Sequence, residues 1–140
     1  SLPARLQPTL RRVAERFPSV PFLCHHMGVP RANEPNPYPI FNDIVQSARL
    51  PNIYVKMSGF HYVSAVSWDY PYHDCEWIVR GLYESFGPNR LCWGSDFPPV
   101  QRSMTYRQSL EAFRTHCAFI PPEDQAKILG DNLARLLSRS

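Results

Sequence analysis

The feature that most constrains the fold is a threefold alternation of helical patterns with short apolar runs along the 140 residues. Apolar residues recur at helical spacing over 6–17, 39–49 and 74–86. Each of these segments is followed by a run typical of a strand buried on both faces: VPFLCHH, NIYVKMSG and RLCWGSD. Helices and buried strands in this order predict βαβ units with right-handed crossovers in one parallel sheet. We therefore expect an α/β fold.

The helical patterns also predict which side chains are buried. One face of the first helix carries Leu6, Leu10, Val13 and Phe17. In the third helix the apolar face comprises Cys75, Ile78, Val79, Leu82 and Phe86. Closing helices are expected at about 105–117, 122–129 and 132–138, with Gly130 as a stop between the last two.

Size and composition favour a single domain over residues 1–140, because 44% of the residues are hydrophobic and the chain is short for two cores. A complete eight-stranded barrel needs about 250 residues. The three strands therefore belong either to a small open sheet or to part of a barrel.

Charge and cysteine usage exclude several classes of protein. The 15 Lys and Arg residues exceed the 12 Asp and Glu residues by only three and are scattered, which argues against a nucleic-acid or membrane-surface partner. The chain contains neither a transmembrane run of roughly 20 apolar residues nor a signal-peptide pattern at its start. Four well-separated cysteines are typical of core residues in a reducing compartment, with a disulfide framework as the alternative. We expect a soluble, cytoplasmic protein.

The connections differ in length at the two ends of the sheet. Links from helix to strand are short, whereas those from strand to helix are long and cover 27–38, 59–73 and 97–104. Long loops at the C-terminal ends of parallel strands are where α/β enzymes assemble their sites. We expect the functional residues at this end.

Side-chain alternation along the strands predicts which residues meet there. If every second residue of each strand faces inward, then His26, Ser58 and Asp96 converge at one rim. The inward residues are Phe22, Cys24 and His26 on the first strand, Tyr54, Lys56 and Ser58 on the second, and Cys92, Gly94 and Asp96 on the third. The helix-covered set is then Leu23, Ile53, Val55, Met57, Leu91 and Trp93, with His25 as its polar exception.

An imidazole and a carboxylate at one rim supply the groups needed to activate water, with or without a metal ion. Asp96 is also compatible with an Asx turn before Phe97, and His26 with a hydrogen-bonded core histidine. Lys56 in a buried strand requires a partner or a substrate anion. His61, in the longest loop, is open to a solvated or a functional role.

Four segments in series, HHMGVPR, NIYVKMSG, FGPNRLCWGSDFP and ILGDNLARLL, resemble the C-terminal part of the amidohydrolase-related family known as amidohydrolase 2. The branch they most resemble contains pyrone-dicarboxylate and sugar-lactone hydrolases. The resemblance implies that the chain is the portion of a TIM (β/α)8 barrel containing about strands 6–8 and their helices.

The resemblance also implies the reaction, which is attack of water on a lactone or related carbonyl of a small substrate. Asp96 would take the proton of the water and His26 would polarise the carbonyl, and both are candidate metal ligands. Arg31, Lys56, Ser58 and His61 are the expected substrate-binding residues, with Arg31 and Lys56 facing a substrate carboxylate. A decarboxylase or hydratase of the same branch is the first alternative.

One departure from the family concerns the metal. The H-x-H pair of the family's first strand and the histidine near its fifth strand have no counterpart here, as expected if the chain begins before strand six. A divalent ion, zinc or manganese, is expected only in the complete enzyme, if at all, because catalytic zinc normally takes three protein ligands. The chain alone is expected to bind metal weakly and to be a poor catalyst. A non-catalytic half barrel that self-associates into a homo-oligomer is the second alternative.

Overall fold

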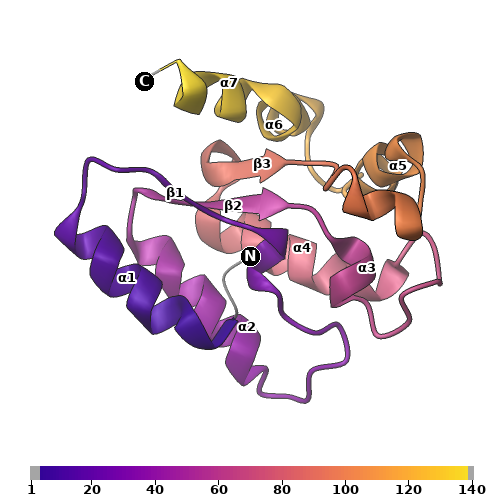
Figure 1. Cartoon of the computed structure of the whole chain (residues 1–140), viewed down its shortest axis with the longest axis horizontal. Coiled ribbons are helices and arrows are strands. Elements are labelled where there is room, and N and C mark those ends of the chain that lie inside the picture. Colours follow the sequence, from indigo (N-terminus) through magenta and orange to yellow (C-terminus); the bar gives the residue numbers. More distant parts are fainter. Residues whose placement is uncertain (1–3, 139–140) are drawn as a thin grey trace.

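The computed structural model describes residues 4–138 and contains one parallel sheet of three strands. The strands are β1 (Phe22–Cys24), β2 (Ile53–Met57) and β3 (Leu91–Trp93), and they lie side by side in that order (Figure 1). Helices connect them, so the expected α/β fold is confirmed. Within the described residues, no helix is long and apolar enough to cross a membrane.

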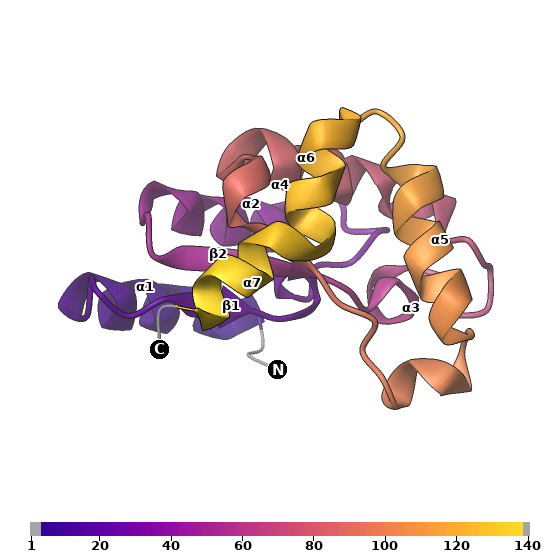
Figure 2. The ribbon, with the colours of Figure 1, turned by 90° about the horizontal axis from the view of Figure 1, so that it is seen from above.

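The helices follow the predicted order. They are α1 (Gln7–Arg16), α2 (Pro39–Val45), α3 (Phe60–Val63), α4 (Glu76–Phe86), α5 (Tyr106–His116), α6 (Pro122–Ala126) and α7 (Asn132–Leu137). The helices α2 and α4 pack against each other beside the sheet, and α6 and α7 lie along β3 (Figures 1 and 2). The short α3, which the sequence patterns did not predict, lies with α5 at the end to which the strands point (Figure 1).

The core lies between the sheet and the helices that cover it. Ile53, Val55 and Met57 are fully buried and alternate with the half-buried Tyr54 and Lys56, so one face of β2 is covered by helices and the other is open. The predicted apolar face of α4 is buried in full. All four cysteines are free and buried, as expected of small core residues.

The prediction for the face of α1 was wrong at Val13 and Phe17, whereas Leu10 is partly buried and packs against the core as expected. Val13 and Phe17 are 38% and 47% exposed, while Gln7, Arg11 and Ala14 are the buried residues of the helix. Polar partners on the next helical segment explain the difference, because the Arg11 guanidinium binds an Asp43 carboxylate oxygen at 2.6 Å. Burial of a charged or polar side chain becomes acceptable when each group is hydrogen-bonded.

Gly130 does not stop a helix. A π-helical segment at Lys127–Asp131 joins α6 directly to α7, so the two predicted helices form one continuous rod. Asn132, the first residue of α7, is 1% exposed and donates its amide hydrogens to the carbonyl oxygens of Pro88 at 2.7 Å and Leu91 at 2.8 Å. This side chain ties the C-terminal rod to the start of β3.

Replacement of Asn132 by Leu is expected to destabilise the fold by about 2–4 kcal/mol, because two largely buried carbonyl groups lose their donor. Chemical denaturation measures the change in the free energy of unfolding. Asn33→Leu, at an exposed loop position, is the control and should stay within about 0.5 kcal/mol of the parent. A loss for Asn132→Leu no larger than that of the control would show that the bridge is dispensable.

Candidate active site

The pairing of the strands corrects the predicted parity of β1. Leu23 pairs with Tyr54, and Lys56 pairs with Cys92, so these residues share the face of the sheet that is open at β2. At β3 the same face is covered, since Cys92 is 1% exposed. Phe22 and Cys24 therefore lie on the helix-covered face and Leu23 on the open face, the reverse of the expectation. His25, which follows the parity of Leu23 and is exposed, does not face the helices as predicted.

A turn after β1 carries His26 to the rim in spite of this parity. Regular strand geometry ends at Cys24, and His26 and Met27 adopt left-handed backbone angles, with φ of 52° and 56°. Such angles cost roughly 1–2 kcal/mol each for residues with a side chain, so the surrounding packing must hold them in place. The turn thereby redirects the imidazole toward the ends of the other two strands.

The three predicted rim residues do converge. His26 Nδ1 lies 3.0 Å from Ser58 Oγ, and His26 Nε2 lies 3.7 Å from Asp96 Oδ1. His26 and Ser58 are 9% and 2% exposed, so this contact is shielded from solvent. One imidazole thus links the C-terminal ends of all three strands.

Asp96 is not the anchor of an Asx turn. The local turn is closed instead by Ser95, whose Oγ accepts a hydrogen bond from the Phe97 backbone at 3.2 Å. Asp96 itself has a φ of 61°, and its buried Oδ2 has no hydrogen-bond partner in the described part of the chain. A buried carboxylate oxygen without a partner is costly and is typical of a group that meets a substrate, water or ion.

A pocket of about 490 Å³ opens beside this cluster and is lined by His26, Val29, Arg31, His61 and Tyr62. His61 is buried, with an Nδ1 that has no partner among the described residues, and its ring lies 3.9 Å from that of Tyr62. Sequence reasoning missed Tyr62, for which the only signal was an aromatic residue next to a loop histidine. Burial and the nearby Asp96 carboxylate raise the pKa of the Tyr62 phenol.

Lys56 extends along the open face of the sheet. A Cβ at Gly94 would overlap Lys56 Cε, so the missing side chain of Gly94 is what lets the lysine lie across β3. Lys56 makes no hydrogen bond or ion pair with any described residue, although its charge helps to lower the pKa of both His25 and His26. The predicted need of this amine for a partner is therefore unmet within residues 4–138.

Acid is expected to destabilise the protein through its site histidines. Burial is the main cause that lowers the pKa of His26 and of His61 below 6.5, and the Asp96 carboxylate only partly opposes it. Both imidazoles therefore stay neutral in the folded protein at a pH where the unfolded chain already binds protons, and stability should fall as the pH drops below about 6.5.

Histidine NMR titration should give midpoints below 6.5 for both rings, and thermal melting should follow the loss of stability. In the His26→Gln and His61→Gln double variant, the decline below pH 6.5 should become shallower. A melting temperature that is constant or rises between pH 7 and 5.5 would contradict this expectation.

Whether the site can hold a metal ion depends on the number of ligand atoms that the described residues supply. His26 Nε2 and Asp96 Oδ1 are atoms of the kind that zinc prefers, and the free Oδ2 of Asp96 is available as well. Among residues 4–138, however, no group of three or more His, Cys, Asp or Glu side chains is placed to hold a metal ion. The described residues fit two positions of a metal site.

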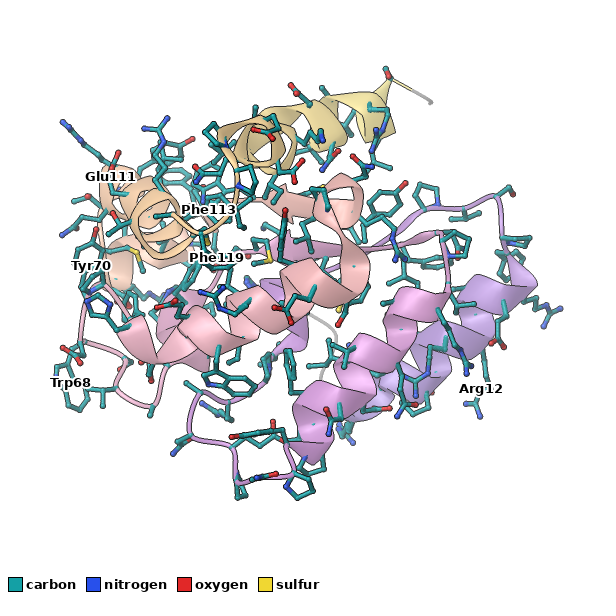
Figure 3. All side chains as sticks on the ribbon, turned by 180° about the vertical axis from the view of Figure 1, so that it is seen from behind. Arg12, Trp68, Tyr70, Glu111, Phe113 and Phe119 are labelled. Carbon is teal, nitrogen blue, oxygen red and sulfur yellow. The ribbon has the colours of Figure 1, made fainter. Side chains whose placement is uncertain are left out.

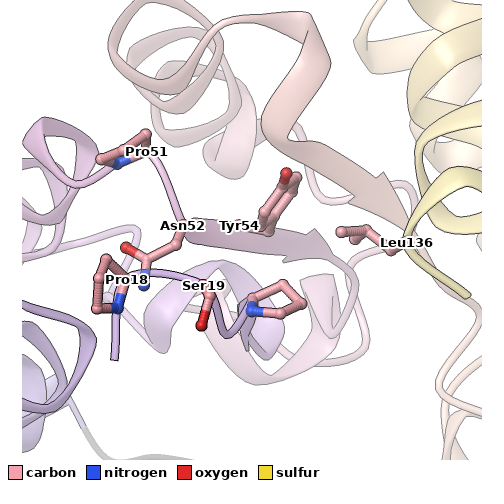
Figure 4. Close-up of a pocket in the computed structure, with 7 residues that line it drawn as sticks. Pro18, Ser19, Pro51, Asn52, Tyr54 and Leu136 are labelled. Carbon is pink, nitrogen blue, oxygen red and sulfur yellow. The ribbon is translucent and has the colours of Figure 1, made fainter. Parts of the chain in front are cut away.

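A second pocket lies at the opposite end of the strands (Figure 4). It is lined by residues that precede β1 and β2, including Pro18, Ser19 and Asn52, and by Tyr54 and Leu136. Among the described residues that line it, none carries an imidazole, a carboxylate or an amine. The chemistry-bearing residues are gathered at the predicted end of the sheet.

A parallel sheet with an imidazole, a carboxylate and a pocket at the C-terminal ends of its strands defines the class of α/β enzymes with rim active sites. The chain belongs to the amidohydrolase family Amidohydro_2, whose model matches residues 1–139. The resemblance identified from the four segments is therefore confirmed.

Comparison with individual proteins identifies two lactone hydrolases as relatives. The chain is 30% identical over 135 residues to the 4-sulfomuconolactone hydrolase of Hydrogenophaga intermedia, covering 93% of the chain and 44% of that protein. It is 27% identical to the L-fucono-1,5-lactonase of Burkholderia ambifaria, covering 89% of the chain and 44% of that protein.

Among solved structures, a zinc-bound amidohydrolase from Burkholderia multivorans matches with a TM-score of 0.85 at 20% identity, over 98% of the chain and 50% of that structure. The chain thus spans about half the length of the relatives it matches, and its fold is that of a corresponding part of a TIM-barrel amidohydrolase.

Proposed function

We propose that the complete protein is a hydrolase that adds water to the carbonyl of a lactone, and that residues 1–140 form one partial TIM-barrel domain containing strands 6–8. The observation that carries the proposal is the buried Oδ2 of Asp96, which has no hydrogen-bond partner among residues 4–138 and lies beside the His26 imidazole and an open pocket. The lactone-hydrolysing relatives named above support this substrate class.

In this reaction the water oxygen bonds to the lactone carbonyl carbon, and the ring C–O bond breaks to give a hydroxy acid. Asp96 takes one proton from the water and returns it to the departing ring oxygen. His26 Nε2 faces the same space and donates to the oxyanion when it carries the ring proton.

Ser58 acts through His26 in this scheme. When the Ser58 hydroxyl donates to Nδ1, the proton of the neutral ring is on Nε2, ready for the oxyanion. When Nδ1 instead donates to Ser58, Nε2 is free to bind a metal ion. We therefore assign Ser58 to positioning the imidazole, in place of the direct substrate contact expected from the sequence.

Arg31 and His61 line the pocket and are proposed to contact the substrate, with Lys56 as a further cation on the open sheet face. A divalent ion, zinc or manganese, would be held by His26 and Asp96 together with ligands outside the described residues. Such an ion would polarise the lactone carbonyl and favour ionisation of water. The free, buried cysteines support a reducing, cytoplasmic location.

A substrate panel tests the proposed function. The complete protein should hydrolyse lactones and leave 2-oxo acids and unsaturated dicarboxylates unchanged, as followed by acid release and by product analysis. Release of carbon dioxide, or hydration of a carbon–carbon double bond, with lactones left intact would assign the site to a decarboxylase or a hydratase and overturn the proposal.

Self-association of residues 1–140 is a second candidate property. Four apolar side chains on the surface favour it, because Val13, Phe17, Val20 and Leu137 are 38–68% exposed. In size-exclusion chromatography the isolated chain should elute as a dimer or larger species at micromolar concentration. Replacing Val13 and Phe17 with Ser should shift it toward the monomer, and a monomeric parent chain would contradict the expectation.

A further inference from the structure

The pocket beside the strand ends has two walls that come from different segments of the chain. Val29 and Arg31 lie in the segment that follows β1, whereas His61 and Tyr62 lie on α3. Neither segment is part of the sheet, so strand pairing does not hold it in place. The shape of the pocket therefore depends on contacts that join the two segments to each other and to the helices.

Backbone groups join the two walls along a seam. A helix leaves its last carbonyl groups without partners, and α3 is only a single turn. The Val63 carbonyl oxygen accepts a hydrogen bond from the Ala32 amide at 2.9 Å. The Tyr62 carbonyl oxygen accepts another from the Arg31 guanidinium at 3.2 Å. The segment after β1 thus supplies the donors that the end of α3 lacks.

Two side chains at the start of α4 hold these walls from outside the pocket. Trp77 donates the hydrogen of its indole Nε1 to the Ala32 carbonyl oxygen at 3.2 Å. Directly after α3, Asp74 Oδ2 accepts hydrogen bonds from Ser64 Oγ at 3.0 Å and from the Ala65 amide at 2.8 Å. Asp74 and Trp77 therefore form a clamp, in which each residue holds one wall.

Packing fixes the Trp77 ring. Its centroid lies 4.8 Å from that of Tyr38 and 5.0 Å from that of Phe41. Phe41 in turn occupies the space left by the missing side chain of Gly81, where a Cβ would lie 2.6 Å from Phe41 Cζ. A ring enclosed in this way has few alternative positions, so its N–H stays directed at the Ala32 carbonyl.

We propose that Trp77 is a positioning residue for the site, and that the clamp fixes the separation of the two pocket walls. Trp77 acts through Ala32 and does not line the pocket itself. The lactone hydrolysis proposed above supplies the kinetic test, whereas the arrangement of the walls does not depend on the reaction. Loss of the clamp weakens substrate binding and leaves the bond-breaking step intact.

Replacement of Trp77 by Phe in the complete protein keeps an aromatic ring in place and removes the indole donor. For a lactone that the parent hydrolyses, KM should rise about fivefold while kcat stays within about twofold. Ser64→Ala removes a donor to Asp74 and should raise KM in the same way without altering Trp77. A constant KM in both variants, or a fall in kcat at constant KM, would overturn the proposal.

The control variant is Trp68→Phe, which makes the same chemical change at a side chain that is 83% exposed. Trp68 projects from the edge of the molecule (Figure 3). Both KM and kcat should be those of the parent. A rise in KM equal to that of Trp77→Phe would show that the effect does not come from the hydrogen bond to Ala32, and the proposal would fail.

Hydrogen exchange of the Ala32 amide tests the clamp without a substrate. In Trp77→Phe this exchange should be about fivefold faster than in the parent, because the seam with Val63 opens more often. NMR resonances of Val29 and Tyr62 should shift, while those of Ser58, at the end of β2, should not. These results support the clamp even if the parent hydrolyses no lactone, in which case only the proposed function fails. Unchanged Ala32 exchange overturns the clamp.

Discussion

Replacement of Asp96 by Asn in the complete protein is expected to reduce kcat/KM for lactone hydrolysis by about 10²–10⁴-fold. The amide is nearly the same size as the carboxylate but does not accept the proton of water. It also exchanges an oxygen near His26 for a group that binds a divalent ion poorly. Steady-state kinetics on a lactone that the parent protein hydrolyses measure the loss.

Two controls separate this chemical effect from damage to the fold. The melting temperature of Asp96→Asn should equal or slightly exceed that of the parent, because the variant removes the charge from a buried oxygen that has no hydrogen-bond donor among the described residues. Asp131→Asn, an exposed position in the C-terminal rod, should retain full activity. Activity of Asp96→Asn within a few-fold of the parent would remove Asp96 from the proposed role.

The fold was predictable where local patterns and packing agree. The apolar stripe of α4 faces the sheet as its spacing requires, and Ile53, Val55 and Met57 of β2 are buried as expected. The expectation that β2 is buried on both faces was wrong, because Tyr54 and Lys56 on its other face are only half-buried. The face of α1 was not predictable, because its buried side depends on Arg11 meeting Asp43, which lies 32 residues further along the chain. Helical periodicity reports the stripe of apolar residues and carries no information on a distant counterion.

The sequence predicted which residues meet at the site, but the structural reason that it gave for His26 was wrong. His26, Ser58 and Asp96 meet as expected, yet the first strand has the opposite parity, and it is the left-handed turn at His26 and Met27 that redirects the imidazole. Strand alternation has a period of two and fails once a strand ends early. Tyr62 was missed because it lies on α3, a single helical turn that is too short to produce a periodic signal in the sequence. This turn places both His61 and Tyr62 at the pocket.

Replacement of Gly59 by Ala is expected to impair the site as strongly as the loss of a reacting group, although it removes no functional atom. Gly59 has a φ of 74°, and a Cβ there would lie 2.7 Å from His26 Nδ1 and 2.9 Å from Tyr62 Cδ2. His26 is held by Ser58 and enclosed by protein, so it yields only by breaking that contact. We expect a drop of about 10²-fold or more in kcat/KM, since small displacements of reacting groups have costs of that size.

The matched control is Gly87→Ala, which isolates the steric effect from backbone strain. Gly87 has a similar φ of 70°, but a Cβ there would meet no atom within 4 Å. Gly59→Ala should lose about 1–2 kcal/mol of stability from its left-handed backbone, and Gly87→Ala at least as much, because a ψ of 165° puts Gly87 in a region that only glycine readily adopts. Only Gly59→Ala should lose activity and shift the His26 resonances. If the two variants retain equal activity, then His26 tolerates displacement, and the contact with Ser58 does not position the imidazole for the reaction.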